Sequence, residues 1–159
     1  MEQALRILLE KLKGIDFALI GTFNLFLQGV KVSPHDLDIL TDDEGMDKIS
    51  RIFGSKITLE KEDRYKETKF KIGDTEVHVV SNKNNPLRPQ DFRKQIVWVK
   101  KGDLEVPCMS LESELRFYQQ VGRSKDRGKI DLIQAALKQA RESEETEPSP
   151  SSGSSIKFI

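Results

Sequence analysis

Residues 18–40, ALIGTFNLFLQGVKVSPHDLDIL, place a glycine and two aspartates between apolar runs, in an order that decides the fold. The apolar residues 15–21, IDFALIG, suit a buried strand, and the following TFNLFLQG is typical of a brief helix that ends at Gly29. After the loop VKVSP, residues 35–40, HDLDIL, return to a strand pattern. We therefore expect a strand, a tight turn, a short helix and a second strand.

Two acidic residues interrupt the second of these strands. Side chains alternate along a strand, so Asp36 and Asp38 are expected on one face, while Leu37 and Ile39 point to the other. Carboxylates two positions apart lie about 6–7 Å from each other at the backbone, so both can bind one divalent ion. Salt bridges to nearby Lys or Arg are the alternative, but the cost of burying two acids favours a metal.

Gly21 and Thr22 lie at the junction between the first expected strand and the short helix. Glycine at such a junction allows the close approach of a phosphate, and Thr22 and the free amides of a helix start can donate hydrogen bonds to it. The sequence thus predicts an anion-binding site near a metal-binding site, a combination that suits phosphoryl transfer.

The flanking sequence extends this core on both sides. The leucines at positions 5, 8, 9 and 12 predict a lead-in helix that ends near Gly14, and Thr41 with Glu44 predicts a capping box for a helix that ends at Gly54. After Gly54, apolar residues recur at about every second position, which is the pattern of strands. The expected strands are KITLEKE (56–62), YKETKFKI (65–72), TEVHVVS (75–81), QIVWVKK (95–101) and LEVPCM (104–109), with hairpin turns at Gly73-Asp74 and Gly102-Asp103.

Two helices are expected to follow the strands. Ser110 is predicted to cap a helix through Val121 that Gly122 closes, and residues 124–140 have the apolar spacing of a final helix. We therefore expect one domain over residues 1–140, with 110–140 as its C-terminal helical segment. Residues 141–159 are rich in Ser, Glu and Pro and are predicted to form a flexible tail.

Composition excludes several classes of protein. The 26 basic residues equal the 26 acidic ones, and neither a basic stripe nor interleaved aromatic residues indicate nucleic-acid binding. No apolar run is long enough to predict a membrane span. The single cysteine, Cys108, excludes an internal disulfide and suits a reducing compartment, so a cytoplasmic location is expected.

With these elements in order, the sequence resembles the nucleotidyltransferase superfamily, which has the DNA polymerase beta type of fold, in its small archaeal and bacterial form. The signature of that family is a strand ending in Gly-Gly or Gly-Ser, a short helix, and Asp-x-Asp or Asp-x-Glu on the next strand. The match is good over residues 17–41 and looser up to residue 81. It implies an α/β (α+β) fold, a mixed sheet flanked by helices, with further helices at the C-terminus.

The resemblance also implies a reaction. Gly21 and Thr22 would hold the triphosphate, and Asp36 and Asp38 would bind magnesium. A nucleoside monophosphate would pass from a nucleoside triphosphate, expected to be ATP, to a hydroxyl on a small molecule or a protein, with release of pyrophosphate. The acceptor, the nucleotide preference and the oligomeric state stay open.

Family members normally supply a third carboxylate from a later strand, but the aligned residue here is His78. Three interpretations stay open. Glu76, on the same strand face, reaches the metal after a register shift; or His78 itself binds a metal or acts as the catalytic base; or activity is lost. A histidine ligand would favour manganese or another transition ion over magnesium.

Two basic segments are further candidates. The run GRSKDRGKID is similar to a family motif on a late helix, which implies that Arg123 and Lys125 contact phosphates; a solvated helix face is the alternative. Residues 82–94, which include Arg88, follow the strand of His78 and could border an acceptor cleft or form a plain loop. The competing function is a catalytically degenerate protein that binds a nucleotide or a protein partner, for example in a toxin-antitoxin pair.

Overall fold

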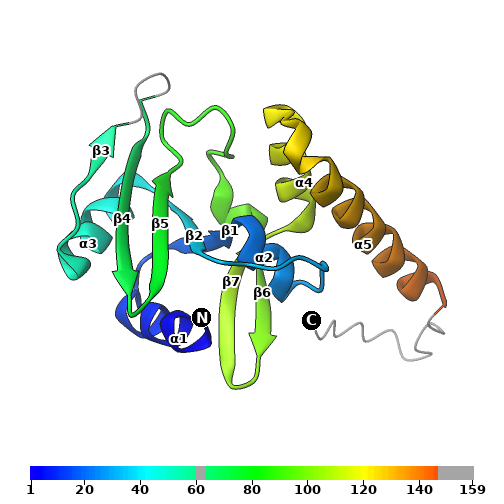
Figure 1. The fold of residues 1–159 in the computed structure, drawn as a ribbon, viewed down its shortest axis with the longest axis horizontal. Helices are drawn as coiled ribbons and strands as arrows, with labels where there is room; N and C mark the ends of the chain where they lie inside the picture. Colours follow the sequence, from blue (N-terminus) through cyan, green and yellow to red (C-terminus); the bar gives the residue numbers. More distant parts are fainter. Residues whose placement is uncertain (60–63, 147–159) are drawn as a thin grey trace.

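The protein folds around one mixed sheet of seven strands in the order β3-β4-β5-β2-β1-β7-β6 (Figure 1). The computed structural model describes residues 1–59 and 64–146. No helix within these ranges is long and apolar enough to cross a membrane. The elements are α1 (Glu2–Lys11), β1 (Phe17–Ile20), α2 (Gly21–Leu27), β2 (Leu37–Thr41), α3 (Asp43–Phe53), β3 (Thr58–Leu59), β4 (Lys66–Ile72), β5 (Thr75–Ser81), η1 (Phe92–Gln95), β6 (Ile96–Lys101), β7 (Leu104–Met109), α4 (Leu111–Val121), η2 (Ser124–Asp126) and α5 (Arg127–Thr146).

The centre of the sheet is built by β1 and β2, which run antiparallel, with β5 parallel to β2 and β7 parallel to β1. In this register Ile20 is opposite Asp38, and Asp38 is beside His78. The end of β1, the start of β2 and the middle of β5 therefore meet at one place. The mixed α+β fold predicted from the sequence is confirmed.

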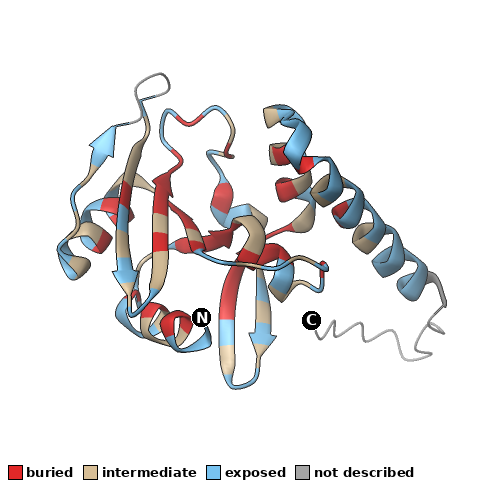
Figure 2. Ribbon diagram, viewed as in Figure 1, coloured by how far each residue is buried: buried red, intermediate tan, exposed pale blue. Residues whose placement is uncertain are grey.

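Strand alternation separates the core from the functional face, as the sequence predicts. Leu37 and Ile39 are buried against residues of α1 and α3 on one face of the sheet. The opposite face carries a smaller apolar cluster that includes Leu40 and Phe92. Buried residues gather along the central strands, whereas the outer faces of the helices are exposed (Figure 2). Since Asp38 lies between Leu37 and Ile39, it points to the face opposite α1 and α3.

Several local predictions are confirmed by the backbone. The hairpins β4–β5 and β6–β7 close at Gly73-Asp74 and Gly102-Asp103, where both glycines have φ of +60°. Ser110 caps α4 by accepting a hydrogen bond from the Ser113 amide.

The predicted capping box is wrong. Asp42, not Thr41, caps α3, because its carboxylate accepts a hydrogen bond from the Gly45 amide at 2.7 Å. The Thr41 hydroxyl instead donates to the carbonyl of Asp16 at 2.7 Å, since Thr41 is still part of β2.

Two predicted boundaries also change. In the strand predicted over 56–62, the described part is strand only at Thr58–Leu59, and residues 60–62 lie outside the described residues. Helix α5 continues to Thr146 and so enters the segment that was predicted as a tail from residue 141. Residues 147–159, the rest of that segment, lie outside the described residues.

Cys108 is predicted to be unreactive in the native protein. It is fully buried in β7, and burial, together with the nearby negative charge of Glu114, raises the pKa of its thiol to about 12. Because the thiolate is the reactive form, we expect dithionitrobenzoate to modify the folded protein at pH 8 at least about 100-fold more slowly than the unfolded protein. Equal rates in the two states would contradict this placement of Cys108.

Candidate functional site

A pocket of about 400 Å³ opens on the sheet face that carries Asp38. Its walls come from the end of β1, the start of α2, the strands β2 and β5, the loop after β5, and α4 with the start of α5. Of the residues expected from the sequence, the pocket lining includes Gly21, Thr22, Asp38, His78 and Arg123. Segments that are distant in the sequence therefore converge on one cavity.

Asp38 lies at the floor of this pocket, between β1 and β5. Its Oδ1 is 3.7 Å from His78 Nδ1, which is too far for a good hydrogen bond, and its side chain is 34% exposed. Its Oδ2 lies against Gly21: a Cβ at that glycine would be 2.8 Å from it. The carboxylate is thus held in the pocket with oxygen lone pairs available to a ligand.

Asp36 is placed differently from the sequence prediction. Strand β2 begins at Leu37, whose partner is Val77, so Asp36 belongs to the loop before the strand and has no ladder partner. It is exposed and is not part of the pocket lining. The expectation of two carboxylates on one strand face is therefore wrong for Asp36.

Gly21 begins α2 with φ of +73°, a conformation that suits glycine. Its amide is already engaged, because it donates to Glu114 Oε2 at 2.8 Å. The Gly21 amide is therefore not free for a phosphate, and Thr22 is the residue of this turn that faces the pocket with a donor.

His78 is held between two carboxylates. Its Nε2 is 2.9 Å from Glu67 Oε2, and its Nδ1 faces Asp38. Burial alone would lower the pKa of His78, but Asp38 and Glu67 outweigh it, and the pKa is raised above the usual 6.5. Glu67 was not predicted from the sequence, although the hairpin register places Lys69 opposite His78 and so Glu67 diagonally across from it.

This raised pKa predicts how stability depends on pH. A group whose pKa is higher in the folded state stabilises the fold below its unfolded pKa, near 6.5, and loses that contribution as the pH rises through the folded pKa. We expect the stability advantage of the wild type over His78→Gln to be larger at pH 6 than at pH 9. Urea unfolding of both proteins with a metal chelator present measures it. An advantage that grows with pH would contradict the arrangement.

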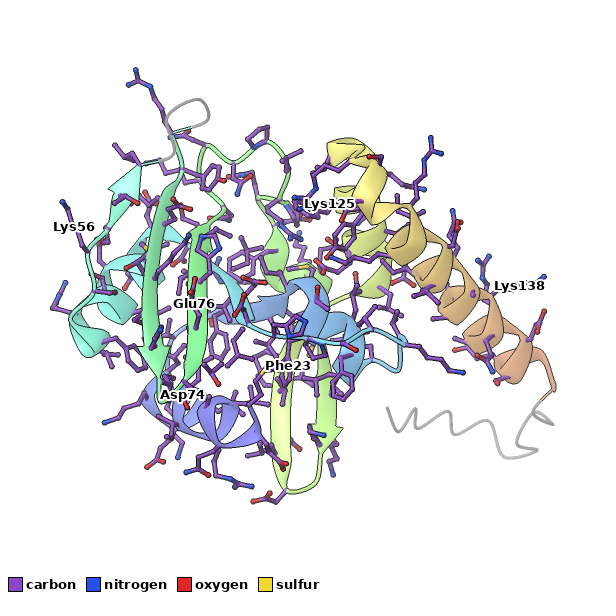
Figure 3. All side chains as sticks on the ribbon, in the orientation of Figure 1. Phe23, Lys56, Asp74, Glu76, Lys125 and Lys138 are labelled. Carbon is purple, nitrogen blue, oxygen red and sulfur yellow. The ribbon has the colours of Figure 1, made fainter. Side chains whose placement is uncertain are left out.

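Glu76 and Lys125 are not brought into the pocket lining. Glu76 lies two residues before His78, towards the Asp74 turn, and its cross-strand neighbour is Lys71 (Figure 3). Lys125 is exposed in η2, between α4 and α5 (Figure 3). Across the described part of the chain, no three His, Cys, Asp or Glu residues are grouped so that they could hold a metal ion.

On the helical side of the pocket, the buried carboxylate of Asp126 contacts two cationic side chains, Arg123 and Lys129. Asp126 is fully buried; its Oδ2 accepts a hydrogen bond from Arg123 Nε at 2.6 Å, and its Oδ1 is 3.7 Å from Lys129 Nζ. Arg123 and Lys129 both line the pocket. Two cations directed by one carboxylate form a suitable binding site for an anionic ligand.

Arg88 is another part of the pocket wall, and Glu114 lies buried behind it. Arg88 Nη1 donates to Glu114 Oε1 at 2.6 Å, and the guanidinium lies 3.6 Å from the centre of the Phe117 ring. Sequence patterns flagged the segment of Arg88 but gave no signal for Glu114, because the partners of Glu114 lie 93 and 26 residues away in the chain.

The carboxylate in the pocket is of the kind that a magnesium ion binds. Mg²⁺ prefers oxygen ligands and is commonly bound through one or two carboxylates, with phosphates and water completing its coordination. Asp38 offers such a carboxylate inside the pocket, and Asp36 lies two residues before it.

Comparison with known proteins gives a consistent result. The sequence profile of the aminoglycoside-2″-adenylyltransferase family matches residues 4–135. A protein from Thermotoga maritima, provisionally described as a nucleotidyltransferase, is 26% identical with a TM-score of 0.68, and the alignment covers 87% of this chain and 92% of that one. No curated protein matches the chain significantly.

Two structures of ANT(2″)-Ia share the fold at lower identity. The crystal structure in complex with adenylyl-2″-tobramycin is 15% identical with a TM-score of 0.59, over 91% of this chain and 94% of that one. The solution structure of this antibiotic-resistance factor is 14% identical with a TM-score of 0.54, over 91% and 97%.

Proposed function

The chain belongs to the aminoglycoside-2″-adenylyltransferase family, and from this premise we propose that it transfers an adenylyl group from ATP to an acceptor hydroxyl, with release of pyrophosphate. The observation that carries the proposal is the meeting of Asp38 with Thr22 and with the cations Arg123 and Lys129 in one pocket. A carboxylate for a metal and donors for phosphates are two of the requirements of nucleotidyl transfer. The proposal takes residues 1–140 as the functional domain.

Each side chain has a distinct part in this proposal. Asp38, with Asp36 nearby, would hold Mg²⁺ or Mn²⁺, and the bound ion would neutralise charge on the phosphates. Thr22, Arg123 and Lys129 bind and orient the triphosphate through hydrogen bonds and charge. His78 is assigned to the acceptor side, where Glu67 fixes the orientation of its ring and Nδ1 is turned towards Asp38.

Tobramycin is the first acceptor to test, because the related ANT(2″)-Ia structure contains its adenylyl derivative. Calorimetry with ATP and either Mg²⁺ or Mn²⁺ measures binding, and mass spectrometry of a panel of hydroxyl-bearing small molecules and proteins measures transfer. We expect ATP binding, release of pyrophosphate and an acceptor that gains an adenylyl group. The absence of both ATP binding and transfer would overturn the proposal.

A second function is favoured by two observations. His78 occupies the position where a third carboxylate is expected, and the described residues offer no group of three metal ligands. A protein that binds a nucleotide or a protein partner without catalysis would fit this arrangement. ATP binding without turnover on any acceptor would support that function instead.

A further inference from the structure

Glu114 of α4 is a fully buried carboxylate behind the pocket wall. Its two oxygens have separate partners: Oε2 accepts from the Gly21 amide at 2.8 Å, and Oε1 accepts from Arg88 Nη1 at 2.6 Å. One side chain thus connects the start of α2, the loop after β5 and helix α4.

Stability alone does not account for a buried ion pair at this position. Removing two charges from water is costly, and apolar side chains of similar volume often stabilise a core as well or better. The side chains of Arg88 and Glu114 are only 4% and 0% exposed, so this cost applies to both. The role of the pair is therefore better explained by the positions in which it holds neighbouring groups than by a gain in stability.

On one side, Glu114 holds the Gly21–Thr22 turn next to Asp38. Gly21 packs against the Asp38 carboxylate, and Thr22 follows it in the pocket lining. A hydrogen bond from the Gly21 amide to an ionised carboxylate is stronger than one between neutral groups, so it restrains the position of this turn.

On the other side, Glu114 fixes Arg88. The guanidinium is held by the carboxylate and by the Phe117 ring, and Arg88 lines the same pocket as Thr22. A guanidinium has five N–H groups, and only one of them donates to Glu114 among the described residues. No other hydrogen bond of this guanidinium is found among the described residues, and Arg88 lines the pocket, so its remaining N–H groups are the donors that it offers to a ligand there.

We propose that Glu114 is a positioning residue that sets the Gly21–Thr22 turn and the Arg88 guanidinium together, and that Arg88 contacts the phosphates of the bound nucleotide. This inference rests on the proposed function, because it assigns the nucleotide as the ligand of the pocket. It adds Arg88 as a binding residue and gives the buried carboxylate a role.

The test compares Glu114→Gln with Glu112→Gln, the same change at an exposed position on the same helix. Glutamine keeps the shape but loses the negative charge and has one accepting oxygen in place of two, so one of the two hydrogen bonds is lost and the other is weakened. We expect Glu114→Gln to raise KM for ATP by about 10-fold or more while KM for the acceptor changes little. Glu112→Gln should leave both constants unchanged. A folded Glu114→Gln with wild-type KM for ATP would overturn the inference.

Arg88→Lys keeps the inference testable if Glu114→Gln does not fold. Lysine keeps the charge but loses the planar set of donors, so KM for ATP should again rise about 10-fold, and an unchanged KM would overturn the role of Arg88.

Amide hydrogen exchange separates this inference from the proposed function. Faster exchange at Gly21 in Glu114→Gln than in Glu112→Gln would support the positioning of the turn, and equal exchange would overturn it. A wild-type protein that neither binds nor uses ATP would overturn the proposed function, whatever the exchange result.

Discussion

Asp38→Asn is expected to lower the rate of nucleotide transfer by at least about a thousandfold, because a neutral amide is a poor ligand for the ion that neutralises the phosphates. Asp38 is the carboxylate that the fold places on the pocket floor, between Gly21 and His78. Fold stability should change little, since the shape is kept and the side chain is partly exposed. Initial rates with ATP and a metal ion, alongside thermal unfolding, measure both effects.

The neighbouring acid provides a sharper comparison. Asp36 is exposed and lies outside the pocket lining, so Asp36→Asn should reduce the rate less than Asp38→Asn does. The double variant should have no measurable transfer. Asp74→Asn, at the exposed hairpin turn, is the matched control and should retain wild-type activity. Full activity in the double variant would remove the proposed mechanism, and equal losses in the two single variants would contradict the placement of Asp36.

Local sequence patterns were sufficient to predict most of the elements. Alternation in HDLDIL correctly placed Leu37 and Ile39 in the core, and turn chemistry correctly placed the hairpins at Gly73-Asp74 and Gly102-Asp103. These features depend on a few adjacent residues, whose preferences agree with the final fold. The same locality explains why the helix caps at Ser110 and Gly54 could be predicted.

Properties that depend on distant partners were not predictable in this way. Nothing near Glu114 in the sequence indicates that it accepts a hydrogen bond from Gly21, because that contact exists only after α4 packs beside α2. Asp36 satisfied the strand pattern, but β5 and β1 begin to pair with β2 one or two residues later. The cap of α3 was predicted wrongly for a similar reason. Thr41 pairs with β5 as the last residue of β2, so Asp42 caps the helix.

Gly21→Ala is the variant expected to have the second largest effect. Alanine at φ of +73° is strained by about 1–2 kcal/mol, and its Cβ would lie 2.8 Å from Asp38 Oδ2. Because that contact is too close, either the turn or the carboxylate must move. A displacement of about 1 Å at a reacting group can lower a rate by about 100-fold, so we expect a loss of that order in kcat/KM for ATP.

Gly54→Ala separates the effect of the contact from that of backbone strain. Gly54 also has positive φ, +63°, but an added Cβ there meets no atom within 4 Å. Both variants should lose about 1–2 kcal/mol in the free energy of unfolding, measured in urea, whereas only Gly21→Ala should lose activity. Equal activities in the two variants would show that the close packing of Gly21 against Asp38 does not matter for catalysis. A loss of activity in Gly21→Ala alone would instead show that catalysis requires the Asp38 carboxylate to lie where a Cβ at residue 21 would displace it.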